Sequence, residues 1–203
     1  MTLKSPQSND LIGQLRNKKY LKKHLSLLEE HDKDSLEHSL RVGALAMDIG
    51  RQNNLSKRDI TVLGAAGLLH DLGKCDIPKE ILTKKSALTQ DERKVIEKHP
   101  QYGFLRLKEK SFATIRKVVI GHHEYTPTPY PRKHRRKEKQ AMQMGRGASV
   151  SYVTQILAVA DMFDALANRR SYKKAFAKAE VRKILLTQFT GEKKLIEQAL
   201  ERF

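Results

Sequence analysis

The sequence predicts a single all-α domain, and three observations support this prediction. The chain has 203 residues, a length at which one domain buries roughly 70% of its unfolded surface. Apolar residues recur at helical spacing along most of the chain. Strand signals are nearly absent, because no run alternates between apolar and polar residues and the chain has no Trp, six Phe and six Tyr. We therefore expect a helical bundle.

Three helices are expected before residue 73. Leucines three to six residues apart mark the first, which lies in an N-terminal helical extension over residues 1–33; they are Leu11, Leu15, Leu21, Leu25 and Leu28. The second helix follows apolar positions over residues 36–49. Ser56 and Asp59 indicate a capping box that opens a third helix, which runs to about Leu72.

The second half of the chain predicts further helices. Thr89 and Glu92 form another capping-box pattern, and the helix that they open is expected to reach His99 and stop before Pro100. Two more helices are expected over residues 111–123 and 151–168. A final pair, broken near Gly191, lies within residues 177–203 and is expected to pack on the core.

Composition and charge limit the class of protein. No apolar run approaches the roughly 20 residues that cross a bilayer, and the first ten residues lack the apolar core of a secretory signal. Cys75 is the only cysteine, so no intrachain disulfide can form. We expect a cytoplasmic protein without membrane insertion. Forty Lys and Arg against 23 Asp and Glu give a net charge of +17, which favours anionic partners.

One segment, residues 125–149, is irregular and rich in proline and basic residues. It lies between His123 and Asp161 in the sequence, so it is expected to be a loop inserted in one domain. Within it, residues 132–139 carry six Lys or Arg and one Glu. This basic stretch is compatible with a lid that attracts anions, with a contact for RNA or an acidic protein, or with a solvated loop.

Histidines and aspartates lie within or just after the apolar helical runs. They are His38, His70, Asp71, His99, His122, His123 and Asp161. A single histidine on an apolar helix face is more often a hydrogen-bonded core residue. Several such groups without partners would each cost about 1–3 kcal/mol, so the joint pattern favours a metal site. Imidazole and carboxylate suit iron, manganese or zinc, and helical bundles host dinuclear sites of this kind.

Five motifs carry a resemblance that spans residues 34–176. They read "HSLRV", "LLHDLGKCDIPKEIL", "HPQYG", "GHHE" and "ILAVADMFDALANRRSYKKA". In order and wording they resemble the HD-GYP subgroup of the HD-domain metal-dependent phosphohydrolases. The resemblance implies an HD-domain helical bundle. It also implies hydrolysis of cyclic di-GMP with two or three metal ions, commonly iron or manganese.

The resemblance also assigns roles to residues. The seven histidines and aspartates named above fall on its metal-ligand positions, with Asp71 as the bridging carboxylate. Asp34 lies one helical turn before His38, where some members hold a third metal, and it could equally be a first-turn helix acid. Lys74, Arg170 and Lys173 match positions that hold the phosphates of the substrate, with a solvated helix end as the alternative. Asp71 and Lys74 would thus serve catalysis by a metal-activated hydroxide.

The loop after the double histidine departs from the family pattern. Tyr130-Pro131 is present, but Pro129 stands where the family has glycine. Proline fixes φ near −65°, whereas glycine also allows positive φ, so the loop backbone can differ. Two alternatives to cyclic di-GMP hydrolysis follow. One is action on another nucleotide or a phosphate monoester, and the other is a non-catalytic module that binds nucleotide, protein or RNA.

Overall fold

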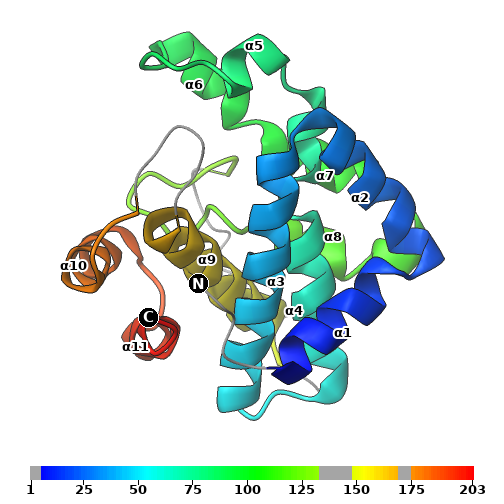
Figure 1. Cartoon of the computed structure of the whole chain (residues 1–203), viewed down its shortest axis with the longest axis vertical. Helices are drawn as coiled ribbons and strands as arrows, with labels where there is room; N and C mark the ends of the chain where they lie inside the picture. The colour runs from blue at the N-terminus through cyan, green and yellow to red at the C-terminus, as the bar shows by residue number, and fades with distance from the viewer. Residues whose placement is uncertain (1–5, 133–147, 169–174) are drawn as a thin grey trace.

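A computed structural model describes residues 6–132, 148–168 and 175–203 (Figure 1). Within these ranges it contains helices and no β-strand. The α-helices are α1 (Pro6–Arg16), α2 (Lys19–His31), α3 (Lys33–Gln52), α4 (Lys57–Leu69), α5 (Lys79–Leu82), α6 (Gln90–Ile96), α7 (His99–Arg106), α8 (Ile115–Val119), α9 (Val150–Ala167), α10 (Lys178–Gln188) and α11 (Lys193–Leu200). Two 3-10 helices, η1 (Leu72–Asp76) and η2 (Lys110–Phe112), complete the set. The all-α prediction is confirmed.

Helices α3, α4 and α9 form the centre of the bundle (Figure 1). The first two approach each other closely because glycine faces glycine: a Cβ on Gly67 would lie 2.4 Å from the Cα of Gly43. Many side chains of these three helices are fully buried, among them Met47, Leu68 and Leu157. The three helices therefore form a tightly packed frame. The histidines and aspartates within their apolar runs can face its interior.

The N-terminal extension contains two helices, where the sequence predicted one. Leu15 and Leu21 are six residues apart, which would separate them by about 120° around a continuous helix. A break between α1 and α2, with Lys18 in an extended conformation, allows both leucines to be buried. Both helices pack against α3 and α4.

Two other helix boundaries differ from the prediction. The capping box of Thr89 and Glu92 is present, but its helix α6 ends at Ile96. His99 instead begins α7, which has Pro100 in its first turn, where the missing N–H of proline costs no intrahelical bond. The helix predicted over residues 111–123 is the single turn η2 followed by the short helix α8, so the double histidine lies in a turn.

The third predicted helix has the expected start and an earlier end. The Ser56 side chain accepts a hydrogen bond from the Asp59 amide and caps α4. The Asp59 carboxylate accepts from the Ala148 amide at 3.0 Å, so it joins α4 to the segment before α9. Helix α4 ends at Leu69, His70 and Asp71 lie in a turn, and η1 begins at Leu72.

The outer helices cover different sides of the frame. Helices α10 and α11 pack against α9 as a pair separated around Gly191 (Figure 1). The short helices α5 and α6 contain no buried residue and project from one end of the bundle. Among the described residues, α9 is the one helix long and apolar enough to span a membrane, with a mean hydropathy of 1.3. Since 61% of α9 is buried inside the protein, it is a core helix of this bundle.

Candidate metal centre

The seven predicted histidine and aspartate ligands meet in one cluster inside the bundle. They are His38 in α3, His70 and Asp71 after α4, His99 at the start of α7, His122 and His123 after α8, and Asp161 in α9. Within the described part of the chain, the donor atoms form three groups, and the atoms of each group all lie within 4.8 Å of one another. The groups are His38–His70–Asp161, His70–Asp71–His122 and His99–His122–His123. Because His70 and His122 each belong to two groups, the cluster is continuous.

The Asp71 carboxylate faces two histidines with different oxygens. Its Oδ2 lies 3.4 Å from His70 Nε2, and its Oδ1 lies 3.4 Å from His99 Nε2. The ammonium of Lys74 donates to Oδ2 at 2.7 Å. Asp71 therefore occupies the position between two donor groups that a bridging carboxylate requires.

Asp161 joins the histidines on the opposite side of the cluster. Its Oδ1 lies 2.9 Å from His38 Nε2 and 3.7 Å from His70 Nε2. Burial alone would raise the pKa values of both aspartates. His70 and Lys74 outweigh it and hold the pKa of Asp71 well below its usual range, and His38 does the same for Asp161. Both carboxylates are therefore ionised at neutral pH, which concentrates negative charge in a buried place.

The imidazole nitrogens show that this donor set fits a cation. His99 and His122 each place Nδ1 against a backbone carbonyl, so Nδ1 carries the proton and Nε2 carries a lone pair. Burial lowers the pKa of His99 to about 3 and that of His122 well below its usual range, so both rings are neutral near pH 7. Their Nε2 atoms nevertheless lie 3.2 Å apart. Two lone pairs cannot hydrogen-bond each other, but both can bind a metal ion.

His70 gives a second sign of the same kind. Its Nε2 is buried and has no hydrogen-bond partner among the described residues. Burial would lower the pKa of this ring, but the negative charges of Asp71 and Asp161 outweigh burial and raise it. A buried nitrogen beside two carboxylates is well placed for a positive charge, which a divalent ion would supply.

Backbone carbonyls orient three of the candidate ligand rings. His70, His99 and His122 each direct Nδ1 to the carbonyl oxygen three residues earlier, which belongs to Gly67, Ile96 and Val119 respectively. These carbonyls lie in the last turns of α4, α6 and α8, where carbonyls commonly accept bonds from outside the regular helical pattern. The Val119 oxygen also accepts from the His122 amide at 3.5 Å. The helix ends thus select the tautomer that turns Nε2 toward the cluster.

Asp164 orients His38 and was not among the predicted site residues. Its Oδ2 lies 2.7 Å from His38 Nδ1, and the Arg41 guanidinium donates to both carboxylate oxygens at 2.9 and 3.0 Å. This arrangement gives the carboxylate–histidine pairing that commonly supports metal ligands. The signal in the sequence was its spacing: Asp164 follows Asp161 by three residues on the same apolar helix, so both face one side.

The other predicted site residues have different outcomes. Asp34 lies in the first turn of α3, where its amide bonds the capping Asp32, and the three donor groups do not include it. Lys74 is at the cluster through its ion pair with Asp71. Arg170 and Lys173 lie outside the described residues, as does the basic stretch after Arg132.

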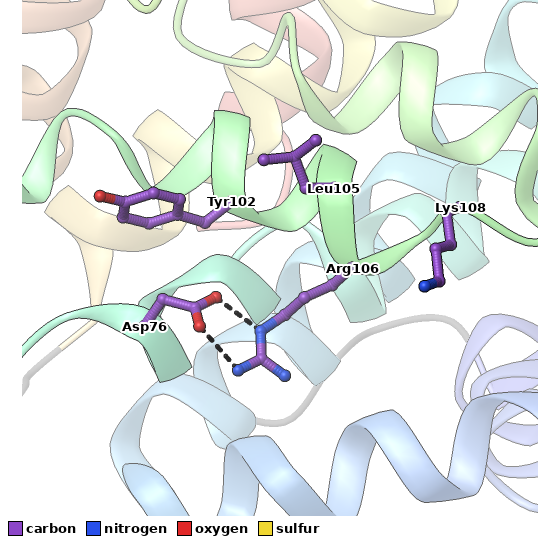
Figure 2. A pocket seen from close by; sticks show the side chains of 5 residues that line it. All are labelled: Asp76, Tyr102, Leu105, Arg106 and Lys108. Carbon is purple, nitrogen blue, oxygen red and sulfur yellow. Dashed lines mark hydrogen bonds and ion pairs between the residues drawn. The ribbon is translucent and has the colours of Figure 1, made fainter.

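A surface pocket of about 530 Å³ lies elsewhere, beside α7 and η1 (Figure 2). It is lined by Asp76, Tyr102, Leu105, Arg106 and Lys108, and none of these is a candidate ligand. Arg106 donates two hydrogen bonds to Asp76 across it. The pocket is therefore separate from the histidine cluster.

The model of the HD domain family matches residues 22–188, so this chain belongs to that family. Among curated relatives, a cyclic di-GMP phosphodiesterase of Thermotoga maritima is 32% identical over 154 residues, which cover 73% of this chain and 39% of the relative. The cyclic di-GMP phosphodiesterase response regulator RpfG of Xanthomonas campestris is 30% identical, over 79% of this chain and 41% of its own length. The chain thus spans about two fifths of the length of these relatives.

Other relatives and solved structures extend the comparison. A 3'3'-cGAMP-specific phosphodiesterase of Vibrio cholerae is 34% identical over 68% of this chain and 28% of its own length. The HD domain of the Listeria monocytogenes phosphodiesterase PgpH, solved with cyclic di-AMP, has a TM-score of 0.59 at 18% identity, over 89% of this chain and 92% of that one. Bd1817 of Bdellovibrio bacteriovorus has a TM-score of 0.65 at 16% identity, over 96% and 60%. These structures share the fold.

Proposed function

We propose that this domain is a metal-dependent phosphodiesterase that hydrolyses cyclic di-GMP or a related cyclic dinucleotide. The observation that carries the proposal is the pair of Nε2 lone pairs of His99 and His122 at 3.2 Å, beside two ionised aspartates. A group of neutral imidazoles and carboxylates of this kind is the donor set of metal-dependent hydrolases. The names of the relatives, phosphodiesterases for cyclic di-GMP and 3'3'-cGAMP, support the substrate class.

The seven clustered histidines and aspartates would hold two metal ions, with iron or manganese as the metal. Asp71 would bridge them, because its two oxygens face different histidines. A third ion would require Asp34. Divalent ions in such a site supply Lewis acidity and a nucleophile at neutral pH.

The chain's own residues would orient the substrate for this reaction. The Lys74 Nζ lies 2.7 Å from Asp71 Oδ2, where it would face a phosphate bound at the cluster. Its side chain retains 16% exposure, so it can be reached from solvent. By the family resemblance, Arg170 and Lys173 would also hold phosphates of the substrate. We place the domain in the cytoplasm.

Two alternatives to cyclic di-GMP hydrolysis can be tested: another substrate, or binding without catalysis. Pro129 in place of the family glycine changes the loop beside the cluster, which favours testing other cyclic dinucleotides, other nucleotides and phosphate monoesters as substrates. A non-catalytic binding module would keep the fold without turnover. A contact of the basic stretch 132–139 with RNA or an acidic protein stays a prediction.

The test is the metal content of the full chain, purified anaerobically, together with turnover of cyclic di-GMP, 3'3'-cGAMP and cyclic di-AMP in the same sample. We expect at least two metal ions per chain and turnover that a chelator abolishes and Mn²⁺ or Fe²⁺ restores. Asp71→Asn should lose both, whereas the surface variant Asp76→Asn should retain both. Metal without turnover of any cyclic dinucleotide would contradict the substrate class, and absence of metal under iron-supplied reducing conditions would contradict the enzyme.

A further inference from the structure

The segment that follows the double histidine packs against the cluster at one ligand, His123. The inference drawn from it rests on the proposed metal centre. Residues 124–132 form a closed loop, because Arg132 donates to both carboxylate oxygens of Glu124, with Nη2 to Oε2 at 2.9 Å and a short contact from Nε to Oε1. The Glu124 side chain is only 5% exposed, so this ion pair fixes the end of the loop against the protein body.

His123 differs from the other four ligand histidines in how its ring is held. His38, His70, His99 and His122 each have a ring nitrogen bonded to a carboxylate or a backbone carbonyl. For the ring of His123, no such hydrogen bond is found within the described ranges; its Nε2 lies 3.9 Å from Asp161. At 20%, its side chain is also the most exposed of the five. Hydrogen bonding therefore does not explain its orientation.

An aromatic stack orients His123 instead. The ring of Tyr130 lies over the ring of His123, with centroids 4.5 Å apart and planes inclined by 25°. On other sides the ring meets His122 at 4.1 Å and the edge of His99 at 5.1 Å. Aromatic rings at this separation attract each other beyond the effect of burial. The imidazole is thus confined between Tyr130 and the other ligands.

The loop in turn fixes Tyr130. Its amide donates to the His123 carbonyl at 3.5 Å, and the Thr126 hydroxyl donates to the same oxygen at 3.2 Å. Prolines at 129 and 131 flank it and restrict the backbone on both sides. Tyr125 anchors the start of the loop to α9 through a hydrogen bond from its hydroxyl to the Ser151 carbonyl at 3.0 Å. The loop therefore presents one aromatic face at a defined place.

We propose that Tyr130 is a positioning residue for His123, and that the Arg132–Glu124 ion pair fixes Tyr130 in that position. The stack does for His123 what carbonyls and Asp164 do for the other ligand rings. The loop that departs from the family pattern at Pro129 thereby contributes to the proposed metal centre.

The experiment is an anaerobic Co²⁺ titration of the metal-free full chain, followed by visible absorption. Tyr130→Leu and Arg132→Ala should weaken Co²⁺ binding by about 10-fold, the lower end of the loss found when a group that orients a ligand is removed, and should change the Co²⁺ spectrum. Tyr130→Phe retains the aromatic face and should restore wild-type affinity and spectrum. The matched control is Arg182→Ala, which removes a comparable but solvent-exposed pair with Glu197 between α10 and α11.

The outcomes separate the inference from the proposed function. If the wild-type chain binds Co²⁺ and Tyr130→Leu and Arg132→Ala bind it with unchanged affinity and spectrum, the positioning role is overturned and the metal centre stands. If the wild-type chain binds no Co²⁺, the proposed metal centre is contradicted, and the role given to Tyr130 is contradicted as well. Circular dichroism and the melting temperature of each metal-free variant identify a variant that loses affinity by unfolding. Arg132, at 50% exposure, is the safer substitution in this respect.

Discussion

Asp164 is the residue whose removal most directly separates ligand orientation from ligation. It contacts His38 Nδ1, whereas the Nε2 atom of the same ring faces Asp161. A carboxylate in this position makes the imidazole a better metal ligand and fixes its ring. Its pKa is lowered despite burial, because His38 and Arg41 both favour the charged form, so it is ionised near neutral pH.

We predict that Asp164→Asn weakens metal binding by about 10- to 100-fold, the usual loss for such an outer residue. The amide retains the size of the carboxylate but lacks its charge, so packing around His38 is preserved. A Mn²⁺ titration of the full chain measures the change. Asp76→Asn, which removes a carboxylate from the surface pair with Arg106, should bind Mn²⁺ as wild type does. Equal affinities for the two variants would contradict the role given to Asp164.

That these seven side chains cluster could be predicted from the sequence, because each lies within or just after an apolar helical run and together they match the metal-ligand positions of the family pattern. Asp164 could have been found by the same reasoning, from its spacing after Asp161. The orientation of His123 could not, since it depends on how the loop through Tyr130 returns to the helix ends. Asp34 illustrates a further limit: its spacing from His38 is compatible with a ligand and with a first-turn acid, and spacing alone cannot choose.

At the level of the helices, the close approach of α3 and α4 is a strict requirement. The atom nearest to a Cβ on Gly67 would be backbone, the Cα of Gly43, which cannot move aside as a side chain could. The carbonyl of Gly67 is also the one that orients His70. The packing of the two helices and the orientation of a ligand therefore depend on the same residue.

We predict that Gly67→Ala lowers the free energy of unfolding by about 1–3 kcal/mol or more, as for overpacked cores, because α3 and α4 must separate. Gly13→Ala is the matched control, since a Cβ there meets no atom within 4 Å and the residue is exposed in α1. That control should raise stability by about 0.5–1 kcal/mol, the usual preference of a helix for Ala over Gly. Urea unfolding of both metal-free variants checks this, and a Gly67→Ala variant as stable as wild type would contradict the packing argument.

Helix boundaries were the least predictable elements, for identifiable reasons. A proline usually ends a helix, yet Pro100 lies in the first turn of α7 because α6 had already ended at Ile96. The break between α1 and α2 follows from the need to bury both Leu15 and Leu21, which a list of apolar positions does not reveal. The capped starts at Ser56 and Thr89 were predictable because their signals are local.

For the whole molecule, the cluster joins segments that are distant in the sequence. His38 and Asp161, for example, are separated by 123 positions and meet at 2.9 Å. Without a cation, the facing lone pairs of His99 and His122 repel each other at 3.2 Å. A bound metal would therefore stabilise the arrangement of α3, α4, α7 and α9 as well as occupy the site.

We predict that Mn²⁺ or Fe²⁺ raises the melting temperature of the chelator-treated chain, because a ligand that binds only the folded state adds stability, about 2.7 kcal/mol at 100 times Kd. Asp161→Asn should abolish the shift, since it removes the charged oxygens shared by His38 and His70. Glu197→Gln, on the exposed surface of α11, should retain it. Differential scanning calorimetry measures the shift, and an equal rise in all three proteins would indicate metal binding elsewhere.

The carbonyls of Gly67, Ile96 and Val119 have a consequence for how this centre can vary through evolution. Three ligand rings take their orientation from main-chain atoms, which every amino acid carries, so replacing the side chain of a residue that supplies a carbonyl does not delete the acceptor. His38 and His123 depend instead on the side chains of Asp164 and Tyr130, and a single codon change can remove either. Mutational robustness is thus unevenly distributed in the proposed centre: one side-chain substitution can remove the group that orients His38 or His123, whereas for the other three rings it leaves the orienting carbonyl in the chain.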